Sequence, residues 1–512
     1  MNNQADAILI YPQLGAFDGF VRDVPLSLIY AAADSVKHGF KVEILDLRLV
    51  GEEWRQEIDR RMSPACKVVG LSVMTGNPIK TSLNVSQYVK EKYGVPVVWG
   101  GPHPTILPEQ TLAHPLIDYV VRDWGSQALL GLLRHLAGED ARLMDIPGLG
   151  WKENGEVRLA PAQDCFEKVH HRDLPYHLVQ IDGRSYNRLE NGEVIFPIFT
   201  AMGCPYKCTF CMSPAVYRKV RGKKWLADPV EEVLEHIEFI SGRYQAQRIQ
   251  ILDDDSFVDL DRMHDLLRRY VAKGFHKRYK LDFRGARINE LDLMDDDYLS
   301  LMEEAGVELL MIGVESGSDT VLKLMGKAIT SEQILRVNRK LARHPRLQPN
   351  YNFFCGIPGE TYQTLVETKN LLVQLVKDHP TCYLGMGSYW KAYPGTVLYE
   401  KAVAQWNVEL PQDLEGWIRF DSFEEGAIDY PWITPAMHQM ISLLQLAGML
   451  LDCKKDRLHH NMGRVKGNIL HWLALAYLPI LRLRLATNYT GLFVEPWVRN
   501  YVVKNISRLI AR

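Results

Sequence analysis

The chain has 512 residues, of which 47% are apolar and 24% are charged. This is ordinary globular usage, and it excludes a single small disulfide module and a globally disordered chain. Its 60 basic and 62 acidic residues leave a formal net charge of -2, which excludes a generally basic nucleic-acid binder. Only eight cysteines are present, and Cys204, Cys208 and Cys211 crowd together, which is more typical of metal ligation in a reducing compartment than of extracellular disulfides.

The start of the chain, MNNQADAILIYPQ, lacks the basic end, long apolar centre and cleavage site of a signal peptide. We therefore expect a cytoplasmic protein. The longest apolar run, residues 469–481, is shorter than the ~18 to 20 residues that span a bilayer, and it contains a proline. A membrane-spanning helix is not expected.

Residues 1–145 alternate short apolar runs such as AILIYP, KVEILDL, KVVGLSV and PVVWGG with helical patterns. This alternation predicts a Rossmann-like open parallel sheet with helices on both faces. Because such sheets bind ligands at the carboxyl ends of their strands, the candidate binding residues are those that follow the strands. They are Gln13; Ser72, Val73, Met74, Thr75 and Gly76; Gly100, Gly101, Pro102 and His103; and Gly125.

Residues 146–194 carry turn-forming sequences and predict a linker with a small hairpin whose tip is Asn154-Gly155. From residue 195 to residue 400 the strand and helix patterns resume in six units, beginning with FPIFTA and ending with TCYLGMGSYW. They predict a partial (β/α)6 TIM barrel, whose working face lies at the carboxyl ends of its strands. The whole chain is thus expected to be α/β, with a helical addition at its end.

Residues 401–512 are predicted to form a helical, Trp-rich domain that is basic and apolar. From Lys454 onward the chain has eleven Lys or Arg residues against two acidic ones, a local charge of +9. The segment ILHWLALAYLPILRLRL is suited to lying in a membrane interface or receiving a lipophilic substrate. A buried helix in a C-terminal cap is the ordinary alternative, and no nucleic-acid reader motif is present.

The most specific motif is GCPYKCTFC, in which Cys204, Cys208 and Cys211 form a C-x3-C-x2-C pattern in the loop after the first barrel strand. Three thiolates from one short loop can hold three irons of a [4Fe–4S] cluster and leave the fourth iron open. A structural zinc site, which usually has four protein ligands, and three unrelated core cysteines remain as alternatives.

With an aromatic residue, Phe210, before its last cysteine, this motif resembles that of the radical S-adenosylmethionine enzymes, and the resemblance covers residues 195–400. It implies that S-adenosylmethionine chelates the open iron and is cleaved, after one-electron reduction, to methionine and a 5′-deoxyadenosyl radical. It also implies a low-potential electron donor such as flavodoxin or ferredoxin. The chemistry requires a low-potential cluster in a pocket that contains little water.

Further residues match the family where the barrel strands end. Asp254 closes the second strand in an Asp-Asp-x-Phe signature, and Arg287 ends the third strand, where it is suited to a bidentate pair with the methionyl carboxylate. Glu315 and Ser316 end the fourth strand, where the family contacts the amino group or ribose of S-adenosylmethionine. The alternative roles are a helix cap for Asp254, a surface position for Arg287 and a structural carboxylate for Glu315. Cys355 is expected to pack in the core.

Residues 1–145 resemble the cobalamin-binding domain of class B radical S-adenosylmethionine enzymes, through PLSLIYAAADSVKHGFKVEILD, VVGLSV and VVWGGPHPT. The chain lacks the Asp-x-His-x-x-Gly motif, so no histidine ligand to cobalt is predicted, and His103 is not taken as one. The Gly-Glu-Gly-Glu-like turn of the family is replaced by Asp123-Trp124-Gly125-Ser126-Gln127. A sheet that has lost its cofactor is the alternative.

Together the two resemblances imply a cobalamin-dependent radical S-adenosylmethionine C-methyltransferase that acts on an unactivated carbon of a lipophilic or natural-product substrate. The implied cofactors are a [4Fe–4S] cluster, S-adenosylmethionine and cobalamin. One alternative is a radical cyclase or oxidoreductase on a tetrapyrrole or lipid, without methyl transfer. An alternative of another class is a non-enzymatic iron–sulfur protein that senses redox state or S-adenosylmethionine.

Overall fold

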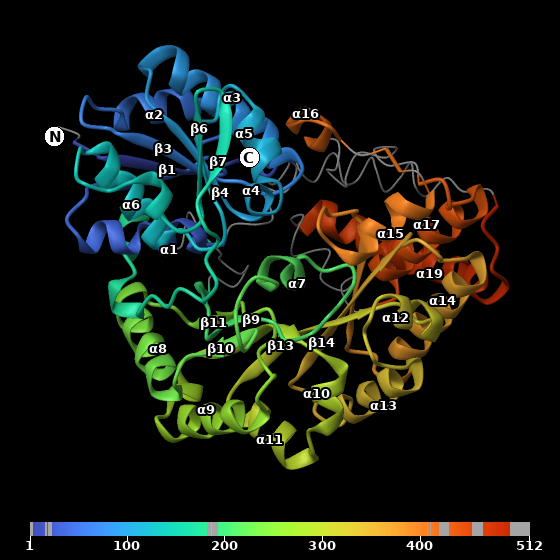
Figure 1. Cartoon of the computed structure of the whole chain (residues 1–512). Helices are drawn as coiled ribbons and strands as arrows, with labels where there is room; N and C mark the ends of the chain where they lie inside the picture. Colours follow the sequence, from blue (N-terminus) through green and yellow to red (C-terminus); the bar gives the residue numbers. More distant parts are fainter. Residues whose placement is uncertain are drawn as a thin grey trace.

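The computed structural model describes residues 4–15, 18, 23–181, 186, 193–406, 408–409, 411–418, 430–452 and 464–491. Figure 1 shows a sheet domain in blue to cyan, a curved second sheet in green to yellow and a group of helices in orange to red. The three parts surround the short helix α7 (Met212–Tyr217). They follow one another along the chain, so each part is built from a continuous segment.

The first part is a seven-stranded sheet with the order β2-β1-β3-β4-β5-β6-β7, in which β1 to β5 are parallel. These five strands are almost wholly apolar because helices cover both of their faces. The strands are β1 (Ala7–Tyr11), β2 (Val42–Asp46), β3 (Val68–Ser72), β4 (Val97–Gly100), β5 (Tyr119–Val121), β6 (Leu149–Glu153) and β7 (Glu156–Leu159). The helices are α1 (Leu26–Lys37), α2 (Trp54–Arg61), α3 (Asn77–Tyr93), α4 (Pro102–Ile106), α5 (Pro108–Ala113) and α6 (Ser126–Leu136).

The strand order places a topological switch point between β1 and β3, because the chain adds β2 on one side of β1 and all later strands on the other. In open α/β sheets the crevice outside the carboxyl ends of the strands at such a point is where ligands bind. The predicted parallel sheet is therefore confirmed, together with an edge at which a ligand is expected.

The hairpin predicted within residues 146–194 is present as β6 and β7, with Asn154 at its tip in the left-handed region (φ 53°). The structure differs from the prediction in the strand with which this hairpin pairs. Strand β6 pairs antiparallel with β5, so the hairpin continues the first sheet and covers its edge, whereas the sequence placed the hairpin in a linker. The edge of β5 has thereby gained the backbone hydrogen bonds that an open strand lacks.

The second part is a six-stranded parallel sheet with the order β15-β14-β13-β12-β11-β8. Each strand lies next to its neighbour in sequence, as in part of a (β/α) barrel. The strands are β8 (Ile195–Ile198), β11 (Arg248–Ile251), β12 (Lys280–Ala286), β13 (Val307–Glu315), β14 (Gln348–Cys355) and β15 (Tyr383–Tyr389). The helices between them are α8 (Val230–Tyr244), α9 (Leu260–Ala272), α10 (Ile288–Leu293), α11 (Asp296–Glu304), α12 (Asp319–Leu324), α13 (Ser331–Leu341) and α14 (Tyr362–Asp378).

A short antiparallel ribbon interrupts this alternation just after β8. It consists of β9 (Ala201–Gly203) and β10 (Trp225–Ala227), and the cysteine motif lies in the connection between them, together with α7. The ribbon therefore holds both ends of the connection that carries the three cysteines. Gly203 has φ 83° and lies against the Lys224 carbonyl and the Phe166 ring, so this position has no room for a side chain.

The last described elements are helical, as predicted: α15 (Val397–Trp406), α16 (Leu414–Ile418), α17 (Pro435–Leu450) and α19 (Arg464–Thr487). Helix α17 packs on α14 and β15, whereas α16 packs on the first part of the chain. There the Trp417 indole donates to the Gln110 side-chain oxygen at 2.6 Å. The C-terminal segment thus contacts both sheets and joins them.

Helix α19 has apolar side chains on both its buried side and its exposed side. Ala474, Leu478, Leu481 and Leu485 are buried, while Trp472, Leu473 and Leu483 are 60 to 69% exposed. Across the ranges described by the structure, no helix is both long and apolar enough to cross a membrane. Seven of the eleven basic residues counted from Lys454 onward lie outside the described residues, namely Lys454, Lys455, Arg457, Arg499, Lys504, Arg508 and Arg512.

Candidate functional site

The cysteine loop is anchored at the carboxyl end of the barrel. Its Thr209 amide donates to the Met325 carbonyl at 3.0 Å, and the Thr209 hydroxyl donates to the Leu324 carbonyl at 2.9 Å. Cys208 is buried, and Cys204 and Cys211 are half-buried. The loop is therefore held in place through residues other than the thiols, which remain available as ligands.

Burial disfavours the charged thiolate form of the cysteines in this loop. It raises the pKa of the Cys204 thiol to about 12 and also raises the pKa of the Cys211 thiol. The charged neighbour that reaches a sulfur is Arg287, whose Nη1 donates to Cys208 Sγ at 3.3 Å. A cationic iron centre would supply the compensating charge, so three buried thiols from one loop fit an iron–sulfur cluster.

Among the described residues, no group of three or more His, Cys, Asp or Glu side chains is arranged around one point as for a single metal ion. A [4Fe–4S] cluster does not require such convergence, because each thiolate binds a different iron. The donor set thus fits the cluster through its chemistry, three sulfurs in one short loop.

Arg287 lies next to this loop, as its match to the family predicted. Its guanidinium stacks over the Tyr206 ring at 3.8 Å, and its Nε lies 3.9 Å from Asp255 Oδ2. The Nε atom is buried and has no hydrogen-bond partner among the described residues. A buried donor without a partner is costly, and a carboxylate ligand would satisfy it. Contact with S-adenosylmethionine remains a prediction for this residue.

The two aspartates that follow β11 have different surroundings. Asp254 accepts hydrogen bonds from the Ser213 hydroxyl at 3.0 Å and from the Tyr217 hydroxyl at 2.8 Å, both on α7. Asp255 is fully buried, and its pKa is raised to about 8, first by burial and then by the nearby Glu290. Sequence reasoning singled out Asp254, whereas the structure places Asp255 beside Arg287.

Glu315 and Ser316 lie at the end of β13 as predicted, but both already have protein partners. Lys327 Nζ donates to Glu315 Oε1 at 3.1 Å, and both side chains are buried. Ser316 Oγ lies 3.1 Å from Thr368 Oγ1 on α14. Glu315 has φ 71°, a left-handed conformation that is rare for this residue type and concentrated at functional sites. The Lys327 partner was not anticipated.

Phe210, the aromatic residue of the motif, packs edge to face on Phe354 of β14 with ring centroids 5.0 Å apart. Cys355 is buried, and the core role predicted for it agrees with its 1% exposure. The aromatic residue of the cysteine motif therefore packs against the end of β14.

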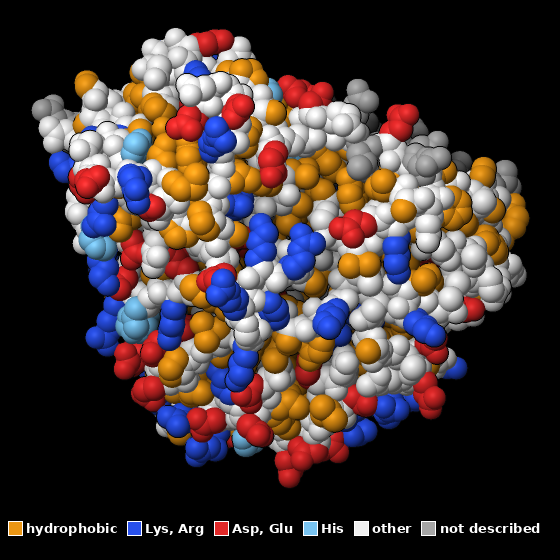
Figure 2. Space-filling view, viewed as in Figure 1, with side chains coloured by type: hydrophobic (Ala, Val, Ile, Leu, Met, Phe, Trp, Pro, Cys, Tyr) orange, Lys and Arg blue, Asp and Glu red, His pale blue; other side chains and the backbone are white. Residues whose placement is uncertain are grey.

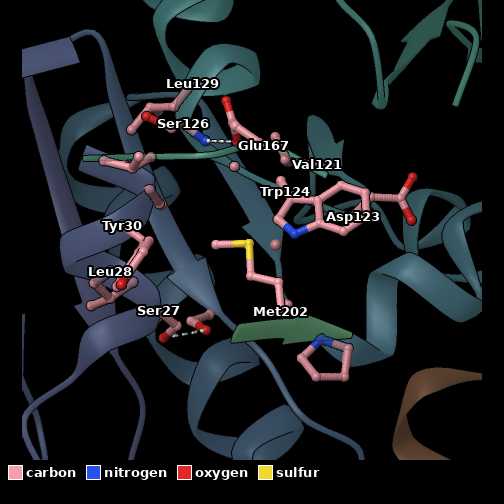
Figure 3. A pocket seen from close by; sticks show the side chains of 18 of the residues that line it. Ser27, Leu28, Tyr30, Val121, Asp123, Trp124, Ser126, Leu129, Glu167 and Met202 are labelled. Atoms are coloured by element: carbon pink, nitrogen blue, oxygen red, sulfur yellow. Dashed lines mark hydrogen bonds between the residues drawn. The ribbon is translucent and has the colours of Figure 1, made fainter. Parts of the chain in front are cut away.

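A cavity of about 460 Å³ lies between the first part of the chain and the barrel. Figure 3 shows the Trp124 ring and the Met202 thioether next to each other in its middle, with Ser27, Leu28 and Tyr30 of α1 on one side. Its walls include Leu9 of β1, the ends of β3, β4 and β5, and the barrel residues Phe199, Ala201, Met202, Gly203, Tyr217 and Asp254. The same cavity therefore borders both the switch point of the first sheet and Gly203, the residue that precedes Cys204 in the barrel.

Five of the eleven predicted cofactor-binding residues of the first domain line this cavity: Ser72, Gly100, Gly101, Pro102 and Gly125. Gly101 has φ 97°, and a Cβ there would approach the Val73 amide nitrogen to 2.9 Å, so the turn requires glycine. Small residues at these strand ends leave the space that a large ligand would occupy. These small residues fit the cofactor-binding role that the resemblance implies for this domain.

The other six do not line the cavity and are Gln13, Val73, Met74, Thr75, Gly76 and His103. Gln13 Nε2 donates to the Gly51 carbonyl at 3.1 Å, Val73 is buried, and Met74 is 38% exposed. His103 is fully buried, with its Nδ1 3.0 Å from Thr75 Oγ1 and its ring 6.0 Å from that of Trp417. Burial lowers the pKa of His103 to about 4, so its ring is neutral.

Sequence reasoning missed several residues of the cavity wall. Trp124 stacks on Tyr217 with ring centroids 6.4 Å apart and meets Phe166 edge to face at 5.2 Å. The Glu167 carboxylate accepts from the Ser126 and Gln127 amides at the start of α6. Trp124 could have been found, because it lies in the turn that follows β5. Glu167 and Phe166 carried no signal, since they lie in an irregular stretch.

Comparison with known families identifies two domains in the chain. Residues 17–133 match the B12 binding domain, and residues 198–372 match the radical SAM superfamily. These matches coincide with the first sheet and with the barrel that carries the cysteine loop.

Curated relatives span much of the chain. An uncharacterized methyltransferase of Pyrococcus horikoshii, PH0819, is 29% identical over 385 residues, which is 74% of this chain and 78% of the relative. An anaerobic magnesium-protoporphyrin IX monomethyl ester cyclase of Rubrivivax gelatinosus is 24% identical over 59% of this chain and 53% of the cyclase. Methyltransferases and a cyclase are therefore both among the proteins to which the chain is similar.

Among solved structures, the chain has the fold of TsrM from Kitasatospora setae, a radical S-adenosylmethionine methyltransferase determined with cobalamin and a [4Fe-4S] cluster bound. The TM-score is 0.64 at 18% identity, over 99% of each chain. At this identity the likeness establishes the shared architecture and leaves the substrate open.

Proposed function

Because the chain belongs to the radical S-adenosylmethionine enzymes that carry a cobalamin-binding domain, we propose that it is a C-methyltransferase acting on an unactivated carbon of a small lipophilic substrate. The observation that supports this proposal most directly is the shared cavity. Strand ends of the B12 binding domain line it on one side, and Gly203, the residue before Cys204, lines it on the other. A substrate placed there is within reach of both cofactors.

Each part of the site has residues suited to one cofactor. Cys204, Cys208 and Cys211 would hold the [4Fe–4S] cluster. Phe210, Asp254, Arg287, Glu315 and Ser316 are the candidates for S-adenosylmethionine, and the cavity residues Ser72, Gly100, Gly101, Pro102 and Gly125 are the candidates for cobalamin. When bound, these groups supply a hydrogen-abstracting radical and a methyl group.

The protein itself orients the reactants and keeps water away. Trp124 and Tyr217 line the cavity between the two domains, and Phe166 packs against both rings. The Tyr217 hydroxyl in turn holds Asp254, so the wall and the barrel end are connected through one hydrogen bond. Apolar walls of this kind protect reactive intermediates from quenching and fix the substrate in place.

Label transfer tests the methyl-transfer step. Protein reconstituted anaerobically with iron, sulfide and cobalamin is incubated with dithionite as the one-electron reductant, with S-adenosylmethionine deuterated in its methyl group and with an organic extract of bacterial cells. We expect a product that carries the deuterated methyl group, together with 5′-deoxyadenosine, both measured by mass spectrometry. Formation of 5′-deoxyadenosine together with an altered product that carries no label would overturn the methyltransferase proposal. It would favour a cyclase or oxidoreductase, an alternative that the 24% identity to the cyclase supports.

The exposed side of α19 supports contact with lipid or with a lipophilic substrate. Leu473 is 60% exposed beside Trp472, and basic residues accompany this helix. We expect Leu473→Glu to lower co-sedimentation with phosphatidylglycerol vesicles by about tenfold, because it places a charge in the apolar face. Leu293→Glu, at a more exposed position (76%) in the barrel, is the matched control. Equal sedimentation of the two variants and the wild type would contradict a membrane role.

A further inference from the structure

A dense group of positive charge lies beside the cysteine loop. Five of the seven residues 218–224 are Lys or Arg and none is acidic, and a sixth basic residue, Lys207, lies inside the loop itself. Lys207, Arg218, Lys219, Arg221 and Lys223 are exposed. Figure 2 shows Lys and Arg side chains gathered over the middle of the molecule, where Figure 1 places α7 and β10.

Little of this charge is neutralised by the protein. Arg221 pairs with Asp164 at 2.8 Å, but within the described residues no ion pair includes Lys207, Arg218, Lys219 or Lys223. Three exposed arginines of the barrel differ in this respect. Arg336 and Arg339 on α13 and Arg343, which follows that helix, each lie within 4.0 Å of an aspartate. Unpaired charges of one sign create a local potential that attracts an oppositely charged partner.

The ribbon of β9 and β10 fixes this segment against the start of the cluster loop. Trp225 pairs with Gly203, so Lys223 and Lys224 approach the residue that precedes Cys204. Pro205, Lys223, Lys224 and Trp225 also line one open hollow of about 680 Å³, together with Val258, Asp259, Leu260 and Asp261. Two of the basic residues, Lys223 and Lys224, therefore share a hollow with Pro205 of the cluster loop.

We propose that Lys207, Arg218, Lys219, Arg221 and Lys223, which we call the basic collar, are the docking surface for a small acidic one-electron donor protein. This inference rests on the proposed function, in which the cluster receives an electron from outside the chain. One electron leaves the donor, which is oxidised, and enters the cluster, which is reduced. No bond or proton changes in this step, and it needs no further reactant.

The size and shape of the collar favour such a donor over a nucleic acid. Complexes between redox proteins are small and transient, and they form by electrostatic steering of a compact partner. Nucleic-acid sites instead follow a backbone with phosphate contacts over an extended stripe. The collar consists of Lys207 and one short segment, residues 218–223, and the hollow that Lys223 lines also contains two aspartates.

Charge reversal tests the collar in two independent measurements. The variant Arg218→Glu/Arg221→Glu/Lys223→Glu is compared with Arg336→Glu/Arg339→Glu/Arg343→Glu, which changes the charge equally on and just after α13. With flavodoxin as the probe, titration calorimetry at low ionic strength should show at least about tenfold weaker binding for the collar variant alone. The difference should shrink in high salt, which screens the attraction. Binding can be measured without the cluster.

Turnover then separates docking from chemistry. With reduced flavodoxin as the donor, we expect the collar variant to form 5′-deoxyadenosine at least about tenfold more slowly than the wild type, and with dithionite at the same rate. Binding of flavodoxin to the collar variant at the wild-type level would overturn the proposal, as would equal losses of rate with both reductants. If wild-type protein is inactive with dithionite, the proposed function fails, whereas the calorimetry still tests docking.

Discussion

We expect Cys208→Ala to abolish the brown chromophore of the anaerobically reconstituted protein and its cleavage of S-adenosylmethionine. Removing partners that only support metal ligands costs about 10- to 100-fold in affinity or activity, so the loss of a ligand in a three-cysteine set should cost more. Cys208 is also the sulfur to which Arg287 donates, at 3.3 Å. Iron content, visible absorption and 5′-deoxyadenosine formation are the three measurements.

Cys165→Ser is the matched control for this variant, because Cys165 is an exposed thiol outside the motif. It should retain iron, absorption and cleavage at wild-type levels. The circular dichroism of both variants should match that of the wild type, since hydrogen bonds of Thr209 to the Leu324 and Met325 carbonyls hold the loop without the thiols. Survival of both chromophore and cleavage in Cys208→Ala would contradict the assignment of the cluster.

We expect Gly125→Phe to remove cobalamin binding while the protein stays folded. Gly125 lies in the cavity wall with φ -102°, which any residue adopts, and a Cβ there meets only Ala31, at 3.2 Å. The phenyl group should therefore enter the space proposed for the cofactor. We expect affinity for hydroxocobalamin to fall at least about a hundredfold, because an occupied core-like space tolerates little extra volume. Corrin absorbance after gel filtration measures it.

Gly242→Phe makes the same change on the far side of α8, where no atom lies within 4 Å of an added Cβ. It should bind cobalamin as the wild type does. Thermal unfolding of both variants shows whether the fold is intact. Undiminished corrin binding by folded Gly125→Phe would mean that the cavity between the domains holds some other ligand.

Features that depend on neighbouring residues could be predicted from the sequence. The spacing of Cys204, Cys208 and Cys211 is local, so the chemistry of the loop could be inferred without knowing the fold. The order of apolar strands and amphipathic helices predicted both parallel sheets, because period and burial are properties of short segments. Arg287 and Glu315 were placed at strand ends by the same reasoning.

Only the tertiary structure decided which of these groups meet. It paired Glu315 with Lys327, placed Asp255 beside Arg287, stacked Trp124 on Tyr217, and left His103 outside the cavity. The hairpin at Asn154 became an edge of the first sheet, and residues 218–224 were brought to Gly203 by strand pairing. The physical reason is the distance along the chain over which each feature is determined. Turn and ligand chemistry are properties of a few adjacent residues, whereas ion pairs, ring stacking and strand partners depend on which distant segments pack together.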